Sequence, residues 1–242
     1  MGKYLHCIVK GKVHPSKISA KGLDGRDISV ITQGGLSCLV SDTSCDHYPL
    51  WREHIIAHQR PIEQAMKHYD VLPFSFSNIA NTGDQVREKV LKERKDEFEE
   101  LFQKFKGKTE VGVKALWPDM QSVFKEIAKN SSELQRFKKR SRLTYQQQMA
   151  AGELVEKLLK QKRNEQARKI LEKLKVFTDD CKESKLIGKN MVVNAAFLID
   201  KGKEMEFSRK IKELMQEHKD IKFNSSGPFP LYNFVSLEIS LV

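Results

Sequence analysis

Apolar and polar positions alternate in several short stretches of the chain, and these stretches predict β-strands. Residues 4–9 carry apolar side chains on both faces, which is typical of a mostly buried strand. Residues 28–32 and 36–40 flank a glycine pair and predict a hairpin, because both glycines can take positive φ. Four further strands are predicted at 71–79, 110–117, 191–199 and 235–241.

Apolar residues also recur at helical spacing. The clearest stripe predicts a helix over residues 48–69 and consists of Trp51, Ile55, His58, Ile62, Met66 and Tyr69. Pro61 lies inside this helix and predicts either a kink or a division into two shorter helices. Two more helices are predicted at 82–106, where Gly107 is the expected stop, and at 204–218.

The order of these elements indicates the fold class. Strands and helices mix without a strict βαβ series, which predicts an α+β fold. We expect an N-terminal mixed α+β sheet domain over residues 1–107 and a C-terminal modified ferredoxin-like domain over 108–242. The second domain has an enlarged first crossover, which is a basic helical insertion at about 120–188. Residues 225–230 are rich in serine and proline and predict a rigid loop before the last strand.

Composition narrows the class of protein. The chain has 242 residues, of which 39% are hydrophobic and 31% charged, and this balance favours a soluble globular protein. No apolar run approaches the roughly 20 residues that span a bilayer, and the start of the chain lacks a signal-peptide core. The four cysteines are scattered without a CxxC pair, so we expect reduced thiols and an intracellular, cytoplasmic protein that does not enter the membrane.

The net charge of +11 is concentrated in one segment. Residues 125–185 hold seventeen basic and nine acidic side chains and so carry +8 of that total. The densest run lies at 136–142 and includes Arg136, Lys138, Lys139 and Arg140. These cations suit phosphates, with Phe137 or Tyr145 stacking on bases, but a single cluster without an RNA-binding motif does not favour nucleic acid. An acidic protein surface, or a solvated helix face, fits the run better, and an RNA-binding module stays the alternative.

The usual signatures of catalysis and metal binding are missing from the sequence. His54 and His58 stand one helical turn apart, but Ile55 occupies the position where a zinc peptidase has its glutamate. His58 also lies on the apolar stripe, which favours a histidine of the core or of an interface. No GxSxG, P-loop or GxGxxG motif occurs in a strand-to-helix setting. We therefore predict a protein that is not an enzyme and has no catalytic residue, metal site or cofactor.

Six sequence blocks together resemble one known family. They are LHCIV at 5–9, WREH at 51–54, VLPFSF at 71–76, EVGVK at 110–114, NAAFLI at 194–199 and SGPFPLYNFV at 226–235. In this order they are similar to the gas vesicle proteins GvpF and GvpL. The resemblance covers nearly the whole chain and is weakest in the basic insertion.

The resemblance implies a minor gas vesicle protein that is an assembly factor or a minor structural component. Its implied partners are the major shell protein GvpA and other minor Gvp proteins, and its implied location is the gas vesicle, with a gas-facing position for one family member. It also implies a two-domain α+β fold and brings no catalytic residue or cofactor. The sequence does not distinguish the GvpF role from the GvpL role.

Two partner-binding regions are hypothesised within this frame. A small hydrophobic shell protein aggregates unless its apolar surface is covered, so an adaptor needs apolar contacts for affinity and charges for orientation. Phe229 and Tyr232, near rigid prolines, are candidates for an apolar contact; the alternative is that Phe229 fills the domain interface. Arg136, Lys138, Lys139 and Arg140 are candidates for docking an acidic partner.

Overall fold

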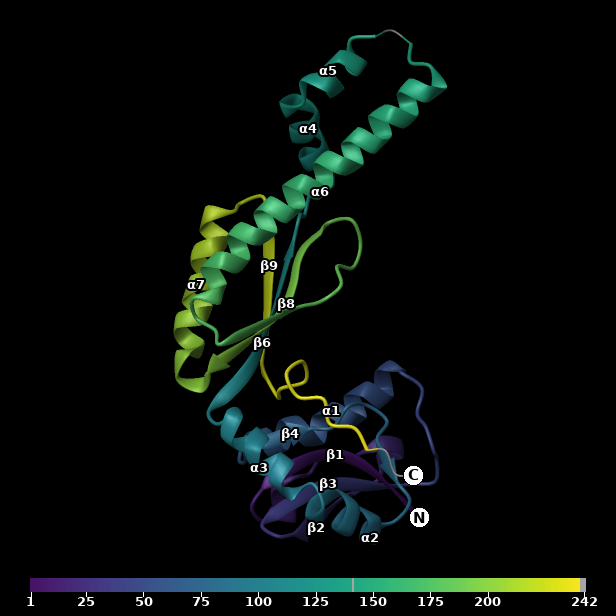
Figure 1. Ribbon diagram of the computed structural model, residues 1–242, viewed down its shortest axis with the longest axis vertical. Coiled ribbons are helices and arrows are strands. Elements are labelled where there is room, and N and C mark those ends of the chain that lie inside the picture. Colours follow the sequence, from purple (N-terminus) through teal and green to yellow (C-terminus); the bar gives the residue numbers. More distant parts are fainter. Residues whose placement is uncertain (141, 240–242) are drawn as a thin grey trace. The chain divides into compact units, whose positions relative to one another are not determined.

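A computed structural model describes residues 1–140 and 142–239 of the chain (Figure 1). The chain forms two compact units, each with its own sheet and core. The first unit consists of Met1–Glu110 together with the segment that starts at Pro228, and the second consists of Val111–Gly227. Both units mix helices with sheets, so the predicted α+β class is confirmed.

The first unit is built on an antiparallel sheet. Its strand order is β2-β3-β1-β4, and β5 pairs with the other end of β1. Gly34 and Gly35 both take positive φ in the turn between β2 and β3, which confirms the predicted hairpin. The strands are β1 (Gly2–Lys10), β2 (Ile28–Gln33), β3 (Leu36–Thr43), β4 (Val71–Pro73) and β5 (Ile79–Ala80).

Helices cover both faces of this sheet. On one face, Ile62 and Ala65 of α1 pack with Cys7, Val9 and Leu39 of the strands. On the other face, η3 and α3 contact strands β2, β3 and β4. The two short turns η1 and η2 lie between β1 and β2. The elements are η1 (Pro15–Lys17), η2 (Leu23–Gly25), α1 (Arg52–Met66), α2 (Gly83–Gln85), the π-helical η3 (Val86–Lys92) and α3 (Lys95–Lys104).

Three predicted elements of this unit differ in detail. The helix α1 runs through Pro61 as one element, so the division into two helices is wrong, and the kink stays a prediction. The predicted strand 71–79 is two short strands, because Ser77 takes a positive φ that interrupts extended backbone. The predicted helix 82–106 contains a π-helical stretch and a break at Arg94, and it ends before Gly107, which has a φ of 70° as expected of a stop residue.

The second unit has a four-stranded sheet with the order β7-β8-β6-β9. Its elements follow each other as β-α-β-β-α-β, which is the element order of a ferredoxin-like motif. Three helices, α4 to α6, form the first crossover, and α4 with α5 and the start of α6 make a helical hairpin (Figure 1). The elements are β6 (Lys108–Leu116), α4 (Met120–Asn130), α5 (Ser132–Lys138), α6 (Tyr145–Lys175), β7 (Asp180–Glu183), β8 (Met191–Asp200), η4 (Lys201–Lys203), α7 (Glu204–Glu217) and β9 (Lys222–Phe229).

The core of the second unit lies between its helices and its sheet. Trp117 is fully buried there, and its indole Nε1 donates to Gln166 Oε1 of α6 at 2.7 Å. Ile170 and Leu174 of α6, together with Phe207 of α7, belong to the same cluster. Residues of α4, α5 and α6 from Leu154 onward join this cluster, whereas residues 145–153 at the start of α6 contribute nothing to it.

The sequence patterns did not predict the two edge strands of this sheet correctly. They missed β7, because its side chains are mostly exposed and polar and give no apolar signal. They also placed a loop at 225–230, where β9 in fact continues through Gly227 and Pro228. Proline is tolerated there because β9 is an edge strand that need not donate every backbone hydrogen bond.

The chain then returns to the first unit instead of forming the predicted strand 235–241. Within the described residues only Leu237 bridges a neighbouring segment, at Phe74, and Ser240 and Leu241 lie outside them. Ser75 N donates to Leu237 O at 2.9 Å, and Ile239 N donates to Asn78 Oδ1 at 2.8 Å. These contacts group the C-terminal segment with the first unit, whereas the predicted domain limits left it in the second. The boundary at 107/108 stays a prediction.

Candidate partner-binding surfaces

The first group of polar side chains is a buried network beneath α1. Tyr4 Oη and His58 Nδ1 share a hydrogen bond of 3.0 Å, and Ser77 N donates to the same hydroxyl at 3.0 Å. His6 Nδ1 donates to the carbonyl of His58 at 3.2 Å, while His6 Nε2 and Ser41 Oγ are 3.1 Å apart. A neutral His6 with its proton on Nδ1 satisfies both contacts, one as donor and one as acceptor.

Burial fixes the protonation of this network. It lowers the pKa of His6 to about 3, with a smaller contribution from His58, and lowers the pKa of His58 to about 4. Gly22 closes the network from one side, since a Cβ there would lie 2.6 Å from Ser41 Oγ. The network is thus sealed and internally satisfied, and the prediction that His58 is a core histidine is confirmed.

The histidine pair on α1 does not converge. His54 Nδ1 lies 3.0 Å from the carbonyl of Pro49, and the His54 ring stacks on Trp51, whereas His58 faces Tyr4. Across residues 1–140 and 142–239, no group of three or more histidine, cysteine or acidic side chains has the arrangement needed to hold a metal ion. No helix in the same ranges is both long and apolar enough to cross a membrane.

An apolar patch that sequence patterns missed lies at the start of α1. Leu50 is 72% exposed and Trp51 is 60% exposed, although Trp51 belongs to the apolar stripe that predicts this helix. Trp51 precedes the first turn of α1, so helical spacing does not carry it onto the covered face. The His54 ring stacks on the indole, with ring centroids 5.3 Å apart. We call Leu50 and Trp51 the Trp51 patch.

The segment that carries Phe229 and Tyr232 is fixed within the first unit. Asn233 donates from its backbone and its side-chain amide to the Glu110 carboxylate at 2.8 and 2.6 Å. Thr109 Oγ1 donates to the carbonyl of Phe229 at 3.2 Å. Both aromatic residues are half-buried, and Tyr232 packs against the core under α1. Their role in contacting a partner stays a prediction.

The hydroxyl of Tyr232 has an unusual environment. It is buried and has no hydrogen-bond partner among the residues that the structure describes. Burial, and to a smaller extent the nearby Glu63 carboxylate, raises the pKa of Tyr232 well above its ordinary value. The phenol therefore stays protonated and packs mainly as an aromatic ring.

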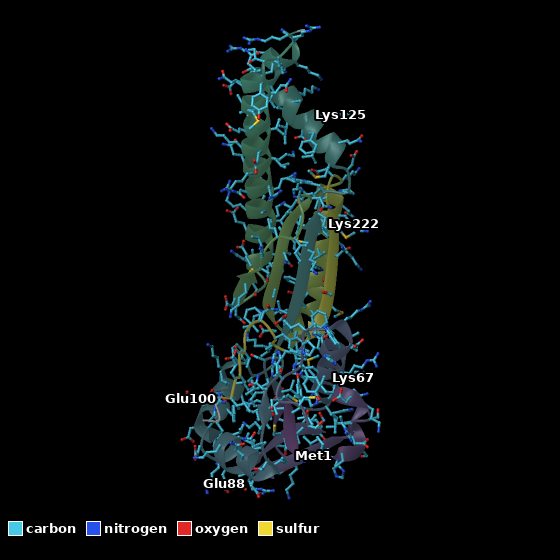
Figure 2. All side chains as sticks on the ribbon, turned by 90° about the vertical axis from the view of Figure 1, so that its right-hand side faces the viewer. Met1, Lys67, Glu88, Glu100, Lys125 and Lys222 are labelled. Atoms are coloured by element: carbon cyan, nitrogen blue, oxygen red, sulfur yellow. The ribbon has the colours of Figure 1, made fainter. Side chains whose placement is uncertain are left out.

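The predicted basic cluster lies where α5 passes into α6. Arg136, Lys138, Lys139 and Arg140 are all exposed, as is Arg142, while Ser141 lies outside the described residues. None of the five cations has a carboxylate within ion-pair distance in residues 1–140 and 142–239. We call residues 136–140 and 142–149 the hairpin tip. In Figure 2 the blue nitrogen atoms of side chains surround this end of the hairpin, beyond the labelled Lys125.

The cations lower on α6 have a different environment. Lys162 pairs with Glu126 of α4 at 2.6 Å, and Lys169 pairs with Glu165 at 2.7 Å. Further pairs join Arg168 to Glu172, Lys173 to Glu217 and Lys175 to Glu183. Five cations of α6 are therefore paired with carboxylates. Within residues 1–140 and 142–239 the tip cations have no such pair, and neither do the more widely spaced Lys125, Lys129, Lys157 and Lys160.

The hairpin tip also exposes apolar side chains. Tyr145 is 76% exposed and Met149 is 51% exposed, and their i, i+4 spacing places them on one face of α6. Thr144 and Gln147 close a capping box that fixes the first turn of this helix. Phe137, by contrast, packs against the core of the second unit. Of the two aromatic residues considered for stacking, Tyr145 alone is exposed.

Comparisons with known proteins agree across the chain. Residues 2–236 match the family described as "Gas vesicle synthesis protein GvpL/GvpF". The chain is 29% identical over 242 residues to gas vesicle protein F of a Streptomyces species, covering 97% of this chain and 100% of the relative. It is 26% identical over 232 residues to gas vesicle protein F of a Nostoc species, covering 93% and 94%.

Two crystal structures share the fold. GvpF from Anabaena sp. PCC7120 superposes with a TM-score of 0.82 at 24% identity, covering 98% of this chain and 97% of that one. GvpF from Microcystis aeruginosa superposes with a TM-score of 0.79 at 23% identity, covering 98% and 99%. The likeness therefore includes both units and the helical insertion.

Proposed function

This chain belongs to the GvpL/GvpF family of gas vesicle proteins, and from that premise we propose that it acts in gas vesicle assembly by binding other gas vesicle proteins. The major shell protein GvpA is the first partner, and minor Gvp proteins are the others. The observation that carries the proposal is the match over residues 2–236, which leaves neither unit outside the family. The proposal assigns no reaction and no cofactor to the chain.

The exposed surfaces are consistent with a binding role. A shell protein with apolar surface must be shielded from self-association until it is incorporated. The Trp51 patch offers an exposed tryptophan that stacks on His54, and tryptophan is enriched among the residues that dominate binding energy. The hairpin tip adds unpaired positive charge, which raises encounter rates with a partner of opposite charge. We propose the vesicle within the cytoplasm, and specifically its gas-facing surface, as the location.

Co-purification with the shell protein tests the apolar part of the proposal. We expect the tagged full-length protein to retain GvpA from vesicle-forming cells, and the double variant Leu50→Ala, Trp51→Ala to retain at least about fivefold less. Met205→Ala is the matched control, because Met205 is an exposed apolar residue of the second unit. Equal recovery of GvpA by the wild type and the double variant would remove the Trp51 patch from the proposal. Absence of GvpA from every sample would contradict binding itself.

An RNA-binding module is the second candidate, and the unpaired tip cations beside Tyr145 are the observation that favours it. Gel-shift titration with single-stranded RNA across a salt series tests it directly. Phosphate binding by the tip predicts retardation at low salt that weakens steeply as salt increases. Absence of retardation at low salt eliminates this candidate.

A further inference from the structure

The tip cations make no ion pair within residues 1–140 and 142–239. Lys162, lower on α6, pairs with Glu126, whereas Arg136, Lys138 and Arg140 have no carboxylate of the described chain within ion-pair distance. The clustered like charges repel each other, while Arg136 and Lys138 in the last turn of α5 interact favourably with the helix dipole. An acidic segment of another molecule would supply the neutralising charge that this surface lacks within the described residues.

The tip has the chemistry of a protein-binding surface. Exposed Tyr145 and Met149 offer an apolar strip on the first turns of α6. Three of the tip cations are arginines, whose guanidinium groups bind carboxylates bidentately. The N-terminal end of α6 adds partial positive charge beside them. Single-stranded nucleic acid binds best to a basic track with several stacking aromatic side chains. Among the described residues of the tip, Tyr145 is the one exposed aromatic side chain, because Phe137 packs inward.

The carboxylates of the hairpin limit where an acidic partner can lie. An open groove of about 670 Å³ between α4, α5 and α6 is lined by Glu126, Glu133 and Glu165 together with Arg136 and Lys162. Lys162 and Lys169 are already paired with Glu126 and Glu165, so the groove offers an acidic chain little unpaired positive charge. The favourable region is therefore the end of the hairpin and the adjacent Tyr145–Met149 face.

We propose that the hairpin tip docks an acidic amphipathic segment of another gas vesicle protein, with Tyr145 and Met149 contacting its apolar side chains and the tip cations contacting its carboxylates. This inference rests on the proposed function only in that the partner is sought among gas vesicle proteins. It adds the site and the chemistry of the segment that the site accepts.

Site-specific photo-cross-linking tests the inference with the full-length protein in vesicle-forming cells. A photoreactive amino acid replaces Tyr145, and mass spectrometry identifies the cross-linked peptide. The same probe at Arg168, an exposed position on the base of α6 that is paired with Glu172, is the control. We expect the tip probe to attach to an acidic stretch of another gas vesicle protein at least about tenfold more often than the control probe does. Attachment to RNA, to lipid or to a segment without acidic residues would overturn the inference, as would equal labelling by both probes.

A matched pair of charge-reversal variants gives a second readout. The tip variant carries Arg136→Glu, Lys138→Glu, Lys139→Glu and Arg140→Glu. The control variant carries Lys125→Glu, Lys129→Glu, Lys157→Glu and Lys160→Glu, which changes the net charge equally at exposed positions elsewhere on the insertion. With the purified cross-linked partner, the tip variant should bind at least about tenfold more weakly at low salt and the control variant within about threefold of wild type.

Two outcomes separate this inference from the proposed function. Equal weakening by both charge-reversal variants would show a net-charge effect and overturn the tip assignment while leaving vesicle assembly intact. Normal vesicles in cells that lack the protein would contradict the proposed function, whatever the tip probe attaches to.

Discussion

The buried network around His6 and the hairpin tip use polar side chains in opposite ways. In the network, Tyr4, His6 and His58 have hydrogen-bond partners inside the first unit, and the cluster is closed to solvent. At the tip, five exposed cations have no carboxylate partner within residues 1–140 and 142–239. We therefore expect the buried network to stabilise the fold of the first unit and the tip cations to be available for binding.

The difference follows from solvation. A polar group that is buried without a partner costs free energy, so the network must be satisfied internally for the first unit to fold. Exposed cations keep their hydration and tolerate the absence of a partner. Changes in the network should therefore act on stability, and changes at the tip should act on binding.

Replacing one tyrosine by alanine in each region should give the largest difference in the free energy of unfolding. Tyr4→Ala removes a fully buried aromatic ring and should lower the free energy of unfolding by about 3–5 kcal/mol. Tyr145→Ala removes an exposed ring and should change it by less than about 0.5 kcal/mol. Urea denaturation followed by circular dichroism measures both. Similar losses in the two variants would show that the tip contributes to stability.

We expect the second-largest effect from acid, which should lower the free energy of unfolding through the two buried histidines. Both buried histidines have a pKa below the ordinary 6.5, at about 3 for His6 and about 4 for His58, so the unfolded chain binds more protons. Their stabilising effect is complete above pH 6.5 and declines as the pH falls toward the folded-state pKa values. Each histidine should contribute a loss of up to about 1.4 kcal/mol per pH unit in that window.

The pH dependence has an internal control. His6→Gln should make the decline of unfolding free energy between pH 6.5 and 4.5 shallower, while replacement of the exposed His14 by glutamine should leave it unchanged. An identical pH profile for wild type and His6→Gln would contradict the assignment of acid sensitivity to the network.

Removing the hydroxyl group of Tyr4 should destabilise the fold, whereas removing that of Tyr232 should not. The difference in the free energy of unfolding should be smaller than for the preceding variants. Tyr4→Phe leaves His58 Nδ1 and Ser77 N without their partner and should cost about 1–3 kcal/mol. Tyr232→Phe removes a buried hydroxyl that has no partner among the described residues, so it should be neutral or stabilising by up to about 1 kcal/mol. Thermal denaturation of the two variants side by side measures the difference, and a destabilised Tyr232→Phe would show that its hydroxyl is satisfied in solution.

The smallest expected effect on stability comes from the tip charges. The quadruple tip variant should unfold within about 0.5 kcal/mol of wild type, because its four side chains are exposed and make no ion pair within the described chain. Equilibrium urea unfolding at low and high salt measures this. A loss of several kcal/mol would show that the cations support the fold and would weaken the case for a binding surface.

Apolar patterning predicted the central elements of both sheets. The strands β1, β6 and β8 are buried on one or both faces, so their sequences carry strong apolar signals. The edge strand β7 has little buried surface and gives no such signal. Val235 and Leu237 alternate as a strand would, yet both are buried through packing of the returning C-terminal segment, a tertiary contact that local sequence does not encode.

The candidate surfaces were only partly predictable. Sequence counts identified the positive run at 136–142, but the absence of ion pairs there depends on where the folded chain places its carboxylates. The exposure of Tyr145 and Met149 depends on how far α6 extends beyond the core. The predicted apolar stripe includes Trp51, because the pattern does not reveal that α1 begins one residue later.

Quantitative electron microscopy of cells lacking this protein, with shell-protein abundance measured in parallel, tests the central claim most directly. The account predicts that vesicles disappear while GvpA is still made, that the full-length chain restores them, and that the tip charge-reversal variant restores fewer than the matched control variant. Normal numbers of intact vesicles in cells without the protein would contradict it.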